Sequence, residues 1–196
     1  MFDGLSNEDV QRACSELIPC LGVKEDICPD NFLRLLYNRD IKGCVQEIAT
    51  RLGLPVRIDL SFVPKGFRPN NKGGFHSSAL AQTDRTGHSI EGIIAQVSIP
   101  QTLPLFGSSS LEGFPIRVQI SENCYDHPST FIAVIAHELS HVLLACLRSP
   151  HKDSELHTDL VPILLGFREC TWSGRKTHKR SVCGNTTTTQ IRHMGI

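Results

Sequence analysis

The stretch PSTFIAVIAHELSHVLLACL (128–147) is an apolar helical pattern interrupted at its middle by a charged motif. Pro128 suits a first helical turn, which predicts a helix over about 128–147. His137 and His141 are four residues apart, so both imidazoles share one helix face and can reach a single metal ion. Burying them together with Glu138 in an apolar helix would be costly without a common partner. The stretch therefore predicts a core helix that carries a metal site.

The residues HELSH (137–141) form an HExxH motif, which is typical of zinc peptidases. Glu138 lies beside the histidine face, so its carboxylate can reach a water on the metal instead of the metal itself. Zinc lowers the pKa of such a water towards about 7, and a nearby carboxylate takes its proton as the water attacks a carbonyl. The motif predicts a zinc metallopeptidase with Zn²⁺ as cofactor, Glu138 as general base, and a peptide or protein substrate.

A catalytic zinc usually has three protein ligands, and the candidates for the third follow the motif. A second helix is predicted over about 154–167, where Glu155 and Asp159 share one face. Glu155 is the preferred third ligand, and Asp159 would fix the tautomer of a ligand histidine. His157 and His151 stay open as alternatives. His157 lies about 200° around the helix from Glu155, so both cannot easily face the metal.

Residues 115 to 167, a strand pattern followed by the HExxH helix and an ExxxD helix, resemble the core of a minimal gluzincin, as in M48-like and ImmA/IrrE-like peptidases. The resemblance implies a zincin-like α+β fold, with a small twisted sheet packed on the active-site helix. It also implies zinc ligation by the glutamate of ExxxD, here Glu155. An edge strand, at 115–121 or 92–100, would bind an extended peptide by strand addition.

Other classes remain as alternatives to a gluzincin. A third histidine ligand would resemble SprT-like proteases, which act on DNA-associated proteins. A peptide deformylase would take an upstream cysteine in an EGCLS-like motif, whereas Cys124 lies in SENCYD. A non-catalytic regulatory domain could keep a metal site, although it would have no need of Glu138. The position six residues after His141 is Leu147, which excludes a metzincin pattern.

The rest of the chain predicts one domain over 1–167 and a polar, basic segment over 168–196. Helices are expected at 5–18 and 29–52, the second in two pieces broken near Gly43, and strands at 55–64, 92–100 and 115–121. Residues 64–89 are expected to form a long exposed loop. Pro162 is expected to kink the chain near Thr158. The threonines at 186–189 are expected to form a strand or a loosely ordered segment.

Charge and composition set limits on the partners. The chain has 20 basic residues (Lys and Arg) and 20 acidic residues (Asp and Glu). This lack of a basic excess argues against a nucleic-acid partner, although the basic run 175–180 leaves such a partner open. The acidic N-terminus and the absence of an 18-residue apolar run predict a cytoplasmic protein with no membrane partner. The eight cysteines lack a CxxC pair and are expected to be reduced; Cys170, His178 and Cys183 form a weaker second metal candidate. No oligomeric state follows from these features.

A peptidase of this type also needs a donor that stabilises the oxyanion of the transition state. The candidates are Tyr, His and Arg residues, whose side chains can donate a hydrogen bond. They are Tyr125, His127, Arg168, His76 and His88. Sequence alone does not choose among them.

Overall fold

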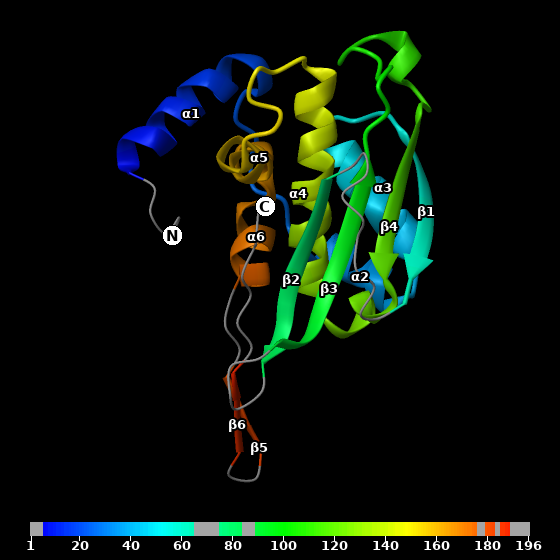
Figure 1. Cartoon of the computed structure of the whole chain (residues 1–196), viewed down its shortest axis with the longest axis vertical. Helices are drawn as coiled ribbons and strands as arrows, with labels where there is room; N and C mark the ends of the chain where they lie inside the picture. Colours follow the sequence, from blue (N-terminus) through cyan, green and yellow to red (C-terminus); the bar gives the residue numbers. More distant parts are fainter. Residues whose placement is uncertain (1–5, 65–74, 84–88, 176–178, 183–184, 189–196) are drawn as a thin grey trace.

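The structure is a computed structural model that describes residues 6–64, 75–83, 89–175, 179–182 and 185–188. It has a mixed α+β fold in which helices pack on one side of a four-stranded sheet. Figure 1 shows helix α4 (Pro128–Cys146) between the sheet and helices α5 (Glu155–Pro162) and α6 (Arg168–Arg175). The predicted helix over 128–147 is therefore confirmed to within one residue.

The N-terminal helices α1 (Asn7–Leu21), α2 (Asp30–Tyr37) and α3 (Ile41–Arg51) lie close to the predicted ranges. The predicted division of 29–52 into two pieces is confirmed, with the break a few residues before Gly43. The break lies before Asp40, where Arg39 has a φ of 59°. Asp40 caps α3 by accepting a 2.8 Å hydrogen bond from the Gly43 N–H. A side chain at residue 43 would overlap that carboxylate, so this glycine permits the cap instead of breaking the helix.

The sheet has the order β1–β4–β3–β2. Strand β1 (Arg57–Val63) runs parallel to β4 (Pro115–Ser121), which pairs antiparallel with β3 (Ser89–Ser98), and β3 pairs antiparallel with β2 (Phe75–Thr83). The expectation that 115–121 or 92–100 forms an edge is wrong, because β4 and β3 are interior strands. The predicted loop 64–89 also contains β2, whose sequence FHSSALAQT lacks the apolar alternation that predicts a strand.

The core lies between the sheet and α4. The predicted inward residues of β4, namely Ile116, Val118 and Ile120, are all buried. On β1 the predicted apolar face is only partly correct, because Phe62 near the end of the strand is half exposed while Val63 is buried. Helix α4 is apolar and long enough to span a membrane by composition, yet nearly all of it is buried inside the domain. Such burial is typical of the core helix of a globular protein.

The seven cysteines within the described residues are free thiols, as expected for that part of the chain. Burial raises the pKa of the Cys44 and Cys170 thiols to about 12, so these thiols pack as small apolar groups. The second metal candidate at Cys170 depends on His178 and Cys183, which lie outside the described residues.

The predicted kink near Thr158 is wrong, because the helical conformation is interrupted later, at Gly166. Helix α5 continues through Pro162, and the non-helical residues are Leu165 and Gly166 in the π-turn Ile163–Phe167. Helix α6 then packs against α4, so packed structure continues past residue 167. The strands β5 (Lys179–Val182) and β6 (Asn185–Thr188) pair antiparallel, in line with the expected threonine strand.

Replacing Gly166 with alanine is expected to lower the free energy of unfolding by about 3 kcal/mol. Gly166 has a φ of +92°, and an added Cβ would overlap the Glu25 carbonyl oxygen. The backbone is held there by the Ile27 N–H, which donates to the Gly166 carbonyl at 2.7 Å. Gly107→Ala is a matched control, because φ is also positive (79°) but the space around it is open. Equal losses in urea unfolding would contradict a role for the Glu25 contact.

Candidate metal centre

The two histidines of the HExxH motif and Glu155 converge between α4 and α5. His137 Nε2 lies 3.2 Å from Glu155 Oε2, and His141 Nε2 lies 3.7 Å from Glu155 Oε1. The three ligand atoms all lie within 4.8 Å of one another. Tetrahedral zinc with bonds of 2.0–2.2 Å places its ligand atoms about 3.4 Å apart. The spacing of this donor set therefore fits one zinc ion.

The other ring nitrogen of each histidine is anchored by the protein. His137 Nδ1 lies 2.9 Å from Asp159 Oδ1, the position expected for Asp159. Because a carboxylate only accepts, the Nδ1–H donates and Nε2 is the atom that faces Glu155. His141 Nδ1 lies 3.4 Å from the Lys152 carbonyl oxygen and 3.3 Å from Thr158 Oγ1. Sequence reasoning missed these last two contacts, since a backbone carbonyl and a threonine carry no signal.

The centre has one buried side and one side that solvent can reach. The rings of His137 and His141 are almost fully buried, whereas 40% of the Glu155 side chain is exposed. Burial disfavours a charged His137, but hydrogen bonds with Asp159 and Glu155 outweigh it and raise its pKa to about 10. Burial and the neighbouring His137 charge lower the pKa of His141 to about 4. The hydrogen bond with His137 lowers the pKa of the Glu155 carboxyl.

Glu138 follows His137 on α4 and is buried, with 1% of its surface exposed. Its negative charge lies close enough to His137 to favour the protonated imidazole. The carboxylate thus belongs to the same local cluster of charges as the histidines. The position next to the metal-facing residues is the one that the motif requires of a base.

The alternative third ligands lie elsewhere. His151 and His157 contact Glu16 of α1, at 3.2 Å and 2.8 Å from Glu16 Oε2. Cys124 is buried in the short 3-10 helix Glu122–Asp126 before α4, where burial raises its pKa to about 11. Of the candidate ligands, only Glu155 is brought to His137 and His141 within the described part of the chain.

The candidate oxyanion donors whose side chains the structure describes, namely Tyr125, His127 and Arg168, are not brought to the centre. The Tyr125 hydroxyl donates to the Arg39 carbonyl oxygen at 3.2 Å. His127 is the N-cap of α4, ten residues and thus about 15 Å along the helix from His137. Arg168 pairs with Asp26. His76 lies in β2 with a side chain outside the described residues, and His88 lies outside them altogether.

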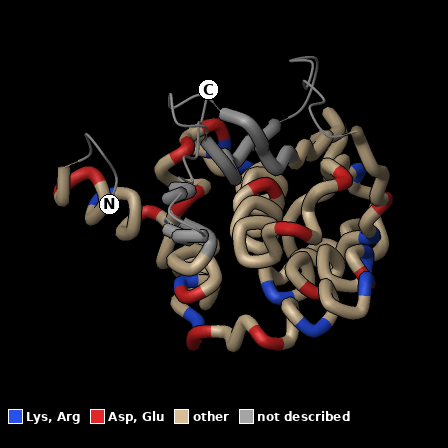
Figure 2. Tube along the Cα trace, turned by 90° about the horizontal axis from the view of Figure 1, so that it is seen from below, with Lys and Arg blue, Asp and Glu red and all other residues tan. Residues whose placement is uncertain are grey.

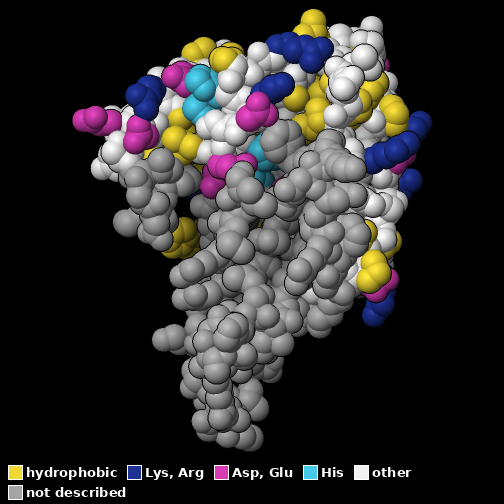
Figure 3. Space-filling model, in the orientation of Figure 1, with side chains coloured by type: hydrophobic (Ala, Val, Ile, Leu, Met, Phe, Trp, Pro, Cys, Tyr) yellow, Lys and Arg dark blue, Asp and Glu magenta, His cyan; other side chains and the backbone are white. Residues whose placement is uncertain are grey.

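The charges of the described residues are mixed in sign along the chain. Figure 2 shows acidic and basic residues interspersed along the described trace. Figure 3 shows acidic and histidine side chains together at the surface beside the region drawn in grey. The side chains of the basic run 175–180 are outside the described residues, so the expectation that the chain has no nucleic-acid partner is not tested there.

No protein-family model, curated protein or solved structure matches the chain. Its function is therefore inferred from the chemistry of the His137–His141–Glu155 centre.

Proposed function

We propose that the chain is a zinc-dependent peptidase of the gluzincin type with a zincin-like arrangement of sheet and helices. His137, His141 and Glu155 would hold the zinc, and Glu138 would be the general base. The observation that carries the proposal is the convergence of two buried imidazoles and one carboxylate at the ligand spacing of tetrahedral zinc. The hydrogen bond between His137 and Asp159 supports it, because ligand histidines usually have such a partner.

The residues of the centre would have different roles in peptide hydrolysis. When bound, zinc supplies a Lewis acid that polarises a carbonyl and makes water nucleophilic near neutral pH. Glu138 accepts the proton of the attacking water and delivers it to the leaving amine. Asp159 keeps the His137 ring oriented with Nε2 towards the centre. The exposed side of Glu155 gives a substrate access to the centre.

An extended peptide would bind along β2. This strand ends the sheet and contacts α4, which carries the histidines. Strand addition at such an edge supplies backbone hydrogen bonds to a substrate without requiring a particular side-chain sequence. The free thiols of the described cysteines support action in a reducing, cytoplasmic compartment.

The position of His157 weighs against the SprT-like alternative. Its ring contacts Glu16 and lies on the far side of α5 from the centre, as the angular separation from Glu155 leads one to expect. Glu155 is therefore favoured as the third ligand, and the gluzincin pattern over a three-histidine site.

A cleavage assay with the full chain tests the proposed function. The chain loaded with zinc is expected to cleave members of a mixed peptide library, to stop when 1,10-phenanthroline is added, and to recover when zinc is restored. A chain that takes up no zinc when it is offered would overturn the proposal. Zinc uptake without cleavage of any library peptide would point instead to a non-catalytic metal-binding domain.

Binding of the first zinc equivalent at pH 7 is expected to release about one proton. With a pKa of about 10, His137 is protonated in the metal-free protein, whereas His141, with a pKa of about 4, is already neutral. The affinity for zinc should therefore rise with pH between 7 and about 10. Calorimetry in two buffers of different ionisation enthalpy measures the released protons. A value near zero would show that His137 is neutral before zinc binds.

A further inference from the structure

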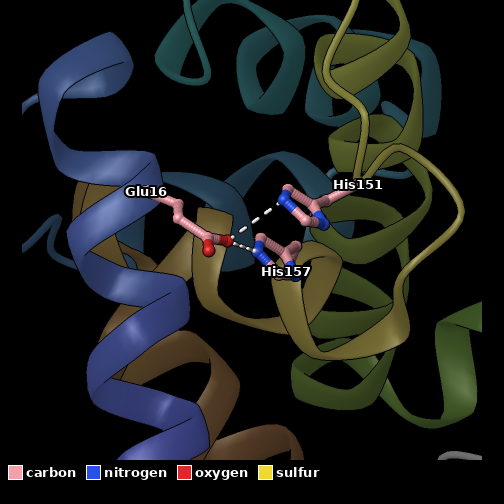
Figure 4. A group of neighbouring side chains, drawn as sticks. All are labelled: Glu16, His151 and His157. Atoms are coloured by element: carbon pink, nitrogen blue, oxygen red, sulfur yellow. Dashed lines mark hydrogen bonds and ion pairs between the residues drawn. The ribbon is translucent and has the colours of Figure 1, made fainter.

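A second group of metal-binding residue types lies outside the proposed centre. Helix α1, the segment after α4 and helix α5 bring together Glu16, His151 and His157, whose ligand atoms lie within 4.8 Å of one another. Figure 4 shows the Glu16 carboxylate pointing towards both rings. The same oxygen, Oε2, lies 3.2 Å from His151 Nε2 and 2.8 Å from His157 Nε2.

The local structure aims both Nε2 atoms at Glu16. The His151 and His157 rings are stacked, with centroids 4.2 Å apart and planes at 6°. Ser154 is the N-cap of α5, and its Oγ lies 2.9 Å from His157 Nδ1. The His157 ring therefore contacts Ser154 through Nδ1 and Glu16 through Nε2. Because the lone pair of an imidazole lies in the plane of its ring, one of the two parallel rings has to turn when both bind the same ion.

We infer that Glu16, His151 and His157 form a second metal site, for Zn²⁺ or another first-row divalent ion such as Co²⁺, Ni²⁺ or Cu²⁺. Two imidazoles and one carboxylate are the ligands that these ions prefer, whereas Mg²⁺ and Ca²⁺ take oxygen ligands. The distances of 3.2 Å and 2.8 Å from the Glu16 oxygen to the two Nε2 atoms are close to the ligand spacing around a tetrahedral ion. The inference does not depend on peptidase activity.

The second site lies at the surface and connects distant parts of the chain. The side chains of Glu16 and His151 are 37% and 41% exposed, so solvent can complete the coordination and the ion can exchange. Weaker binding than at the buried centre is therefore expected. A bound ion would connect α1 to α5 through His157, which is two residues after Glu155. It would also hold the segment whose Lys152 carbonyl contacts His141.

Zinc binding by single variants of the full chain tests this site. After removal of metal and equilibrium dialysis against zinc, elemental analysis is expected to find two ions in the wild type and one in Glu16→Gln. His151→Ala, a change at a partly exposed position, should also retain one. Glu8→Gln is the matched control, because it makes the same change at an exposed position of α1, and it should retain two. Two ions in both Glu16→Gln and His151→Ala would overturn the second site.

The two centres can be separated in the same experiment. In the Glu155→Ala background, zinc is expected to raise the melting temperature, and this rise should vanish when Glu16→Gln is added. Magnesium should cause no rise. No zinc-dependent rise in the Glu155→Ala background would overturn the second site. A single wild-type ion that is lost in Glu16→Gln but kept in Glu155→Ala would support the second site and overturn the proposed peptidase centre.

Discussion

Glu138→Gln is expected to lower the rate of peptide hydrolysis by about a thousandfold while the zinc content stays the same. Glutamine keeps the size and shape of the side chain, which matters at a position with only 1% of its surface exposed. It cannot, however, accept a proton from water at neutral pH. Because Glu138 is not among the three residues that converge at the proposed centre, the ligand set should be unaffected.

The measurement is steady-state kinetics on a peptide selected from the library, together with elemental analysis of zinc. The loss should fall on kcat and not on KM, because proton transfer is needed only in the transition state. Glu112→Gln makes the same substitution at an exposed position before β4 and should leave the kinetics unchanged. Retention of activity within about tenfold would exclude Glu138 as the base.

Glu155→Ala is expected to weaken binding of the tighter zinc ion by more than about a hundredfold. The change removes the carboxylate that approaches both ring nitrogens at 3.2 Å and 3.7 Å. Asp159→Asn should have a smaller effect, about 10–100-fold, since it alters only the partner of His137 Nδ1. Competition with a chromophoric chelator measures the affinities, and Glu169→Ala, at an exposed position of α6, is the control.

His157→Ala distinguishes the rival third ligands in the same assay. It is expected to keep the tighter ion and to lose only the weaker one, because its ring contacts Glu16 instead of the centre. Loss of the tighter ion in His157→Ala, with retention in Glu155→Ala, would establish a three-histidine site. Substrates bound to DNA would then become the first to test.

Features that depend on local spacing could be predicted from sequence. The helix expected over 128–147 is observed over Pro128–Cys146, and it carries His137 and His141 on one face. Strand 115–121 was predicted with its buried face because alternation is also a local property. The contact between His137 and Asp159 is only partly a local feature, because it also requires that α5 pack against α4.

Features that depend on pairing between distant segments could not be predicted. The order of strands, which places β2 and not 115–121 or 92–100 at the end of the sheet, follows from how the hairpin β2–β3 pairs with β4. The missed strand β2 has too few apolar residues to be recognised without its partner.

The sequence by itself determined the helix and the shared face of His137 and His141, because an i, i+4 spacing acts through the geometry of one helix. Only the tertiary structure decided which residue joins them. Packing of α5 on α4 brings Glu155 to the histidines, while packing of α1 on α5 brings Glu16 to His157 across 141 positions of the chain. Side chains on opposite faces of α5 thus meet different neighbours, and that choice is made by the packing of the helices around them.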